Sequence, residues 1–152
     1  MLLILFRIGT GTYALDTSKI TEVLPLIEID PLPDAQPGVA GLLNYRGISV
    51  PVIDLSALAA HGSVRKLLST RLLVLRAGEA PHSPLFALLV EGATETLRVD
   101  PGPLHAGAPV EDSGWFGPVT THRGKLVRIV DVAGMLPGPL RVALGLEAKG
   151  SE

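Results

Sequence analysis

The chain has no cysteine among its 152 residues, and only 4% of its residues are aromatic and 18% are charged. Without cysteine it can form neither a disulfide framework nor a thiolate metal site, and it has no cysteine nucleophile. The low aromatic content disfavours a surface on which nucleobases or sugars stack. A net charge of −2 offers no basic surface for a polyanion, so the sequence argues against nucleic-acid binding.

No stretch of the chain reaches the roughly 18 consecutive apolar residues that a membrane-spanning helix requires. The apolar start, residues 1–6, has no basic leader and is interrupted by Arg7, so we interpret it as a buried strand and not as a signal peptide. The sequence therefore predicts a protein without direct membrane insertion. The absence of cysteine suits a reducing cytoplasm, which is the expected location.

What the chain does have is apolar residues and turn residues. Hydrophobic residues make up 47% of the sequence, and there are 17 glycines and 13 prolines. So many turn residues favour a mainly β fold with many short strands over one with long helices. A chain of this length forms one domain, or two small subdomains that share a core.

A repeat divides the sequence into two similar halves. Residues 44–54 resemble residues 121–131 at a separation of 77, and residues 20–24 resemble residues 93–97 at a separation of 73. Two matches at nearly equal separations predict a duplicated unit, with two β-rich subdomains packed face to face. The matching pairs in the longer segment are Arg46 and Arg123, Gly47 and Gly124, Val50 and Val127, Val52 and Ile129, and Asp54 and Asp131.

The expected elements follow this division. Strands are predicted at residues 2–8, 26–29, 48–53, 71–76 and 85–90, with helices at 20–24, 132–136 and 140–146 and a weaker helical segment at 92–97. Ile20, Val23 and Leu24 would form the apolar stripe of the first helix, which leaves Glu22 facing solvent. The polar segment 61–70 is interpreted as a mobile connector, and residues 101–114 as a long loop.

These elements suggest the domain boundaries. The whole chain, residues 1–152, is expected to form a single domain. The first barrel would span about 15–70, completed by strands of the other half or by the N-terminal strand. The second would span about 71–136, and residues 137–152 would form a C-terminal helix and tail.

The sequence shows no clear catalytic, cofactor or metal site. The four histidines are scattered over loops without the spacing of metal ligands. Residues 9–11 lack the third glycine of a dinucleotide-binding loop, residues 41–47 lack the Lys-Ser/Thr of a phosphate-binding loop, and no Gly-x-Ser-x-Gly motif is present. Asp54 and Asp131 could form an acid–base pair, but each follows a strand and precedes a short helix, so helix capping explains them more simply. A hydrolase using either aspartate or a histidine would need these groups close together in a cleft.

Glu22 and Arg46 are the charged residues of most interest. Arg46 lies in a predicted hairpin turn, where Gly47 supplies a positive φ. The two side chains could form an ordinary surface ion pair, worth about 0–1 kcal/mol. They could instead form a charged rim beside an apolar groove, which orients a partner. The residue pattern leaves both interpretations open.

The run Asn44-Tyr45-Arg46-Gly47, followed by residues 50–55 and spaced as it is from Glu22, resembles the CheW-like domain family. Members of that family couple receptors to kinases in bacterial chemotaxis-type signalling. The resemblance implies a fold of two five-stranded SH3-like β-barrels related by a pseudo-twofold axis. It also implies a non-catalytic adaptor without cofactors, whose partners are the cytoplasmic tip of a chemoreceptor and the regulatory domain of a CheA-type histidine kinase.

By motif position, the resemblance makes Arg46 the partner-facing arginine and Glu22 the acid that pairs with it. The implied partner-binding residues are Ile20, Glu22, Val23, Val39, Gly41, Asn44, Arg46 and Gly47. Ala40 and Tyr45 depart from the residues usual in chemotaxis members, which suggests an alternative pathway such as surface sensing or pilus motility. The alternative function is a small-molecule-sensing barrel, which a closed pocket with converging polar groups would favour over an open apolar groove.

Overall fold

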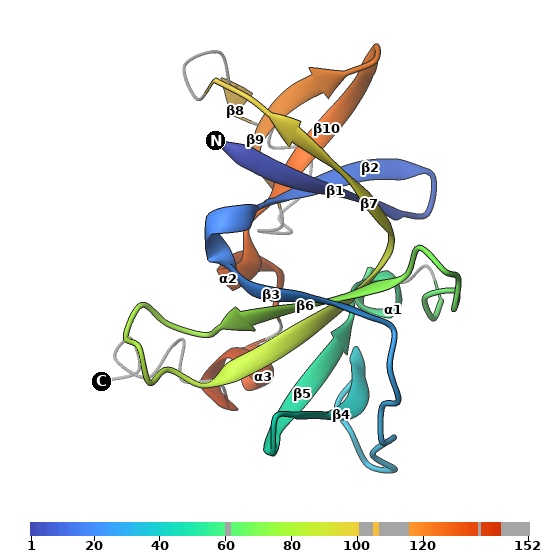
Figure 1. Ribbon diagram of the computed structural model, residues 1–152, viewed down its shortest axis with the longest axis vertical. Helices are drawn as coiled ribbons and strands as arrows, with labels where there is room; N and C mark the ends of the chain where they lie inside the picture. The colour runs from blue at the N-terminus through green and yellow to red at the C-terminus, as the bar shows by residue number, and fades with distance from the viewer. Residues whose placement is uncertain (60–61, 101–104, 107–115, 137, 144–152) are drawn as a thin grey trace.

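The computed structural model describes residues 1–59, 62–100, 105–106, 116–136 and 138–143, and within them the fold is mainly β (Figure 1). Two lobes of curved sheet lie one above the other, joined by the long strand β7. In chain order the elements are β1 (Leu2–Ile8), β2 (Gly11–Asp16), η1 (Thr17–Lys19), β3 (Ile20–Pro25), β4 (Val39–Tyr45), β5 (Ile48–Asp54), α1 (Leu55–Leu58), β6 (Arg71–Arg76), β7 (Leu85–Arg98), β8 (His105–Ala106), β9 (Phe116–His122), β10 (Lys125–Val130), α2 (Val132–Met135) and α3 (Gly138–Ala143).

The strands form two sheets that share β7. In the first barrel the strand order is β3-β6-β7-β5-β4, and in the second it is β7-β1-β2-β10-β9, with the short β8 added at the edge. The N-terminal half of β7 pairs with β6, and its C-terminal half pairs with β1. The strands of the first barrel come from residues 20–98, whereas the second barrel joins β1 and β2 from the start of the chain to β9 and β10 near its end.

The two barrels repeat the same pairings. Both have one parallel pair, in which Val52 aligns with Ala87 in the first barrel and Ile129 with Ala14 in the second. Ile129 lies 77 residues after Val52, and Ala87 lies 73 residues after Ala14, which are the separations of the sequence repeat. The predicted duplication with pseudo-twofold symmetry is thus confirmed in the strand register.

The main core lies between the barrels and holds them together. Successive residues of a strand point to opposite faces, so a strand buried on both faces is apolar throughout. In β1, Leu3 and Leu5 pack inside the second barrel, whereas Ile4 and Phe6 pack in the shared core. The same alternation occurs in β6 and in the first half of β7, which explains the unbroken apolar runs there. The predicted shared apolar core is confirmed.

Residues 20–24 form a strand and not the predicted helix. β3 pairs antiparallel with β6, and its residues alternate between half-buried and exposed. The apolar positions 20, 23 and 24 follow the helical spacing, but five residues are too few for that spacing to decide, and pairing with the apolar β6 makes the segment a strand. Glu22 and Leu24 pair with Val74 and Leu72, on the face of β3 that covers the core of the first barrel, so Glu22 is half-buried and does not simply face solvent. The predicted helical segment at 92–97 is likewise strand, as the continuation of β7.

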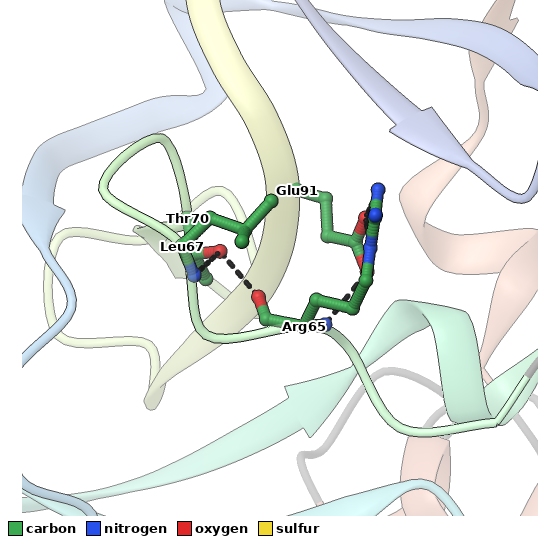
Figure 2. Close-up of polar contacts among 4 residues, drawn as sticks. All are labelled: Arg65, Leu67, Thr70 and Glu91. Atoms are coloured by element: carbon green, nitrogen blue, oxygen red, sulfur yellow. Dashed lines mark hydrogen bonds and ion pairs between the residues drawn. The ribbon is translucent and has the colours of Figure 1, made fainter.

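Two other expectations need correction. Residues 26–29 form no strand, and the nearby pairing is a single bridge between Asp30 and Leu42. The connector is tied down through residues 64–70, where Val64 and Thr70 are buried and Arg65 pairs with Glu91 (Figure 2). Its polar residues serve these contacts, so their polarity did not indicate mobility.

The remaining helices are short. α2 matches the helix predicted at 132–136, and α3 begins before the one predicted at 140–146, whose end lies outside the described residues. Most of the loop predicted at 101–114 also lies outside them, apart from β8. No helix in the described parts of the chain is long and apolar enough to cross a membrane.

Candidate functional site

The site is built on the hairpin that joins β4 to β5. Tyr45 pairs with Ile48, which leaves a two-residue loop of Arg46 and Gly47. Both loop residues have positive φ, 52° and 84°, as a type I′ turn requires. The backbone N–H of Gly47 donates to the Asn44 side-chain oxygen over 2.9 Å. The local sequence therefore fixes the turn and places the Arg46 side chain at its tip.

Glu22 on β3 holds the end of the Arg46 side chain. The same carboxylate oxygen, Oε1, accepts hydrogen bonds from the Tyr45 hydroxyl at 2.6 Å and from Arg46 Nη2 at 2.8 Å. The guanidinium also lies over the Tyr45 ring, 5.0 Å from its centroid. The hydrogen bond to Glu22 raises the pKa of Tyr45, so the hydroxyl remains protonated and donates.

Arg46 is fixed and still available to a partner, because 71% of its side chain is exposed. Holding a long cation in one rotamer before binding lowers the entropy that a partner's docking costs. The predicted pairing of Glu22 with Arg46 is present, and Tyr45 is an additional member that the sequence did not identify. Tyr45 contacts Glu22 from 23 positions away, so no local pattern could have revealed it.

Two other predicted partner-binding residues have backbone roles. Gly41 has a φ of 152°, and a Cβ there would lie 2.1 Å from the Asp30 carbonyl oxygen. Only glycine allows this close approach, which accompanies the bridge between Asp30 and Leu42. Val39 begins β4 opposite Ile53. Gly41 and Val39 therefore shape the backbone of the hairpin, and neither has a polar side chain that could bind a partner.

Ile20 and Val23 pair with Leu75 and Leu73, so both lie on the side of β3 that faces away from the core of the first barrel. Val23 is 44% exposed on the outer face of the first barrel. Ile20 lines a cleft of about 770 Å³ between the barrels, with apolar walls that include Leu75, Phe86 and Ile129. Asn44 and Gly47 line a separate shallow depression of about 200 Å³. The eight predicted residues are therefore spread over the hairpin, the outer face and the cleft mouth.

The cleft is partly enclosed. It is continuous with solvent, and its charged lining residues come from several elements: Asp16, Lys19, Arg76, Glu79 and Asp131. A small-molecule site is concave and encloses most of its ligand. At about 770 Å³, and with a lining that is both apolar and charged, the cleft has the size and chemistry of a small-molecule site as well as of a docking groove.

The two aspartates considered for acid–base chemistry occupy helix N-termini. Asp54 is buried, and its carboxylate accepts from the backbone N–H groups of Ala57 and Val64. Asp131 precedes α2, where its side chain makes no capping hydrogen bond. Among the described residues, no three His, Asp or Glu side chains gather in a way that could hold a metal ion.

The second barrel repeats the charged hairpin. Arg123 and Gly124 have φ values of 53° and 77°, and Arg123 Nη2 lies 3.2 Å from Glu95 Oε2. His122 replaces Tyr45 and lies 3.5 Å from the same oxygen. The sequence repeat matched Glu22 with Glu95 and Arg46 with Arg123, and this signal could have predicted the second ion pair.

Paired SH3-like barrels that present a held arginine beside a cleft define a protein-interaction domain. The chain belongs to the CheW-like domain family, whose model matches residues 2–139. It is similar to a chemotaxis protein CheW of Rhizobium meliloti, at 24% identity over 93% of this chain and 90% of that protein. It is also similar to a chemotaxis protein CheW of Klebsiella aerogenes, at 26% identity over 63% of this chain but only 55% of the relative.

A solved structure shares the fold. The crystal structure of the scaffolding protein TtCheW from Thermoanaerobacter tengcongensis matches with a TM-score of 0.76 and 22% sequence identity. The match covers 86% of this chain and 84% of that one. The mainly β, two-barrel fold expected from the sequence is thereby confirmed, and family and fold together support a chemotaxis-type adaptor.

Proposed function

We propose that this protein is a non-catalytic adaptor that couples a chemoreceptor to a CheA-type histidine kinase. The receptor tip docks against the first hairpin and the cleft, and the kinase regulatory domain binds elsewhere on the barrels. The observation that carries the proposal is the exposed Arg46, held by Glu22 and Tyr45 at the tip of a fixed turn.

The geometry supports docking in two ways. A charge fixed on a rigid hairpin gives orientation and speeds association, because it favours one approach of a partner with complementary charge. The apolar wall beside Ile20 supplies surface that a helical receptor tip can bury. The shared core between the barrels keeps these two parts at a constant distance.

The first experiment measures binding of the purified protein to the receptor-tip fragment and to the kinase regulatory domain of the same organism. Arg46→Glu should weaken binding to the receptor fragment at least tenfold, since it removes the cation and places a like charge beside Glu22. The melting temperature should change by only a few degrees. Arg123→Glu is the matched control, because it makes the same change at the equivalent turn position of the second barrel.

The outcomes separate a docking residue from a structural one. Equal losses of receptor binding in the two variants would contradict the assignment of Arg46. A large fall in stability with unchanged binding would show that Arg46 only supports the fold. In the exchange variant, Glu22→Arg combined with Arg46→Glu, the ion pair should re-form and the fold should be stable, while receptor binding remains weak.

A further inference from the structure

One end of the first barrel presents two exposed segments of opposite charge. The first, here named the acidic segment, is residues 27–34, where Ile27 and Leu32 are 42% and 39% exposed. Its three carboxylates, Glu28, Asp30 and Asp34, are all exposed. It carries no basic residue, so it combines negative charge with accessible apolar surface.

The second segment, here named the basic turn, is residues 65–71. It contains Arg65, Lys66 and Arg71 and no acidic residue. Leu67 is 41% exposed and Leu68 is 99% exposed, the most exposed large apolar side chain in the described parts of the chain. Its side chain therefore leaves its whole apolar surface available to a partner.

The basic turn is held in place and is not a frayed loop. Figure 2 shows Arg65 beside Glu91, whose carboxylate accepts from the Arg65 backbone N–H at 2.7 Å and from its guanidinium at 3.0 and 3.1 Å. Thr70 closes the turn, because its hydroxyl donates to the Arg65 carbonyl and accepts from the Leu67 N–H. The turn thus presents Leu68 to solvent in a defined position.

The two segments are neighbours. Pro25, just before the acidic segment, pairs with Arg71 at the end of the basic turn. Leu26 and Ile29 pack against the same core cluster as Val64, which precedes the turn. Both segments lie on the right-hand side of the lower lobe in Figure 1. Within the described residues, Glu28, Asp30, Asp34 and Lys66 form no ion pair.

We propose that this end of the first barrel binds a second copy of the chain through a twofold contact. In a twofold interface each residue pair occurs twice, so a surface with acids on one side and bases on the other is complementary to itself. The acidic segment of each copy faces the basic turn of the other, and Leu68 packs against Ile27 and Leu32. A purely basic patch would instead suit an acidic peptide or an anionic membrane.

The contact does not involve Arg46 or the cleft, so its test is independent of the proposed adaptor function. The experiment measures the molar mass of the full chain by sedimentation equilibrium from about 10 µM to 1 mM, because a contact made by two short segments of each copy should be weak. The mass should rise from 15.9 kDa towards twice that value. A mass that stays at that of the monomer over the whole range overturns the proposal.

Point variants locate the contact. Leu68→Ser should abolish the rise in mass at 1 mM, whereas Leu126→Ser should leave it unchanged. Leu126 is the matched control, since it is a 60% exposed leucine on β10 of the second barrel. If both variants dimerise like the parent chain, the interface lies elsewhere and the proposal fails. Both sites are exposed, so folding should survive each change, and circular dichroism checks it.

Charge reversal tests the pairing itself. Lys66→Glu combined with Arg71→Glu leaves Arg65, which is already paired with Glu91, as the one cation of the two segments, and Glu28→Lys combined with Asp34→Lys leaves Asp30 as their one carboxylate. Each double variant alone should stay monomeric because like charges face each other, and an equimolar mixture should dimerise. No association in the mixture overturns the proposal. A mass that grows beyond the dimer, or binding to phosphatidylserine vesicles that needs Leu68 while the chain stays monomeric, would overturn it too.

Discussion

The two arginine-glycine hairpins share one backbone conformation but differ in how firmly their side chains are held. In the first barrel, Glu22 lies 2.8 Å from Arg46 and is 32% exposed, and in the second, Glu95 lies 3.2 Å from Arg123 and is 44% exposed. The first acid receives a 2.6 Å hydrogen bond from Tyr45, while its counterpart has His122 at 3.5 Å. Duplication has thus kept the turn and the ion pair and changed the residues that support them.

Asp54 and Asp131, which follow the two hairpins, also differ in how many contacts they make, and again the first barrel has more. Asp54 is buried and accepts two backbone N–H groups, one from α1 and one from Val64. Asp131 is exposed and caps nothing with its side chain. Asp54 therefore ties the end of β5 to both α1 and the connector, a link that the second barrel lacks at Asp131. This difference suggests that the first hairpin is the one prepared for a partner.

Replacing the aspartates should give the largest contrast in stability. Asp54→Ala leaves two N–H groups unpaired, one of them buried, and should lower the free energy of unfolding by about 2–3 kcal/mol. Asp131→Ala removes no capping bond and should change it by less than about 0.5 kcal/mol. Urea denaturation of both variants measures the difference. Equal losses would show that the two barrels are supported alike.

The next contrast concerns Glu91, at the junction of the barrels, and Glu95, at the second hairpin. Burial tends to raise the pKa of Glu91, but hydrogen bonds from the Arg65 backbone and guanidinium, with the charges of Arg65 and Arg7, outweigh it and leave the pKa lowered. Glu91→Gln should lower the free energy of unfolding by about 2 kcal/mol at pH 7. This value already allows for the solvent exposure of Arg65, which weakens the ion pair. Glu95→Gln, at an exposed pair, should cost only a few tenths of a kcal/mol.

The pH dependence of Glu91 has a definite sign. A carboxylate whose pKa is lower in the folded state stabilises the protein above its unfolded pKa, about 4.3, and this contribution is lost as the pH falls through the folded value. The difference in melting temperature between the parent chain and Glu91→Gln should therefore be constant near neutral pH and shrink below about pH 4. A difference that grows on acidification would contradict the lowered pKa.

The sequence predicted the architecture well because the architecture depends on its repeated and apolar positions. The runs in β1, β6 and β7 are apolar on both faces, and the arginine-glycine pairs mark both turns, so the strands and the duplication could be derived. The error at residues 20–24 recurred at 92–97 because these segments are themselves repeats. Each is too short for periodicity to separate a helix from a strand, and only pairing with β6 or β1 decides.

The supporting contacts of the site could not be predicted in the same way. Tyr45 and Glu22, Arg65 and Glu91, and Asp54 and Val64 meet only after the chain has folded. Their residue types are common in loops and turns, and their spacing of 10 to 26 positions matches no local period. Polar residues in the connector consequently suggested mobility, although several of them bind the turn to the barrel.

The turn glycines test whether the backbone of the two hairpins is equivalent. A Cβ at Gly47 or at Gly124 would meet no atom within 4 Å, so alanine adds only the strain of positive φ. Gly47→Ala and Gly124→Ala should each cost about 1–2 kcal/mol in unfolding free energy, with nearly equal values. Thermal denaturation measures both. Unequal costs would mean that the equivalence of the turns does not extend to their energetics.

The smallest expected effect examines the support of the arginines directly. Tyr45→Phe keeps the ring beneath Arg46 and removes only the hydroxyl, so it should cost about 1 kcal/mol through the lost bond to Glu22. His122→Gln in the second hairpin should lower the free energy of unfolding by only a few tenths of a kcal/mol, because the contact between His122 and Glu95 is long.

Double-mutant cycles turn this difference into a coupling energy. The coupling energy between Tyr45 and Glu22, from Tyr45→Phe and Glu22→Gln, should be about 0.5–1 kcal/mol. The coupling energy between His122 and Glu95, from His122→Gln and Glu95→Gln, should be about zero. Receptor binding should weaken several-fold in Tyr45→Phe, since Arg46 then loses its fixed acceptor, and should be unchanged in His122→Gln. A coupling of equal size in both barrels would mean that their arginines are held equally well, and the preference for the first hairpin would lose its physical basis.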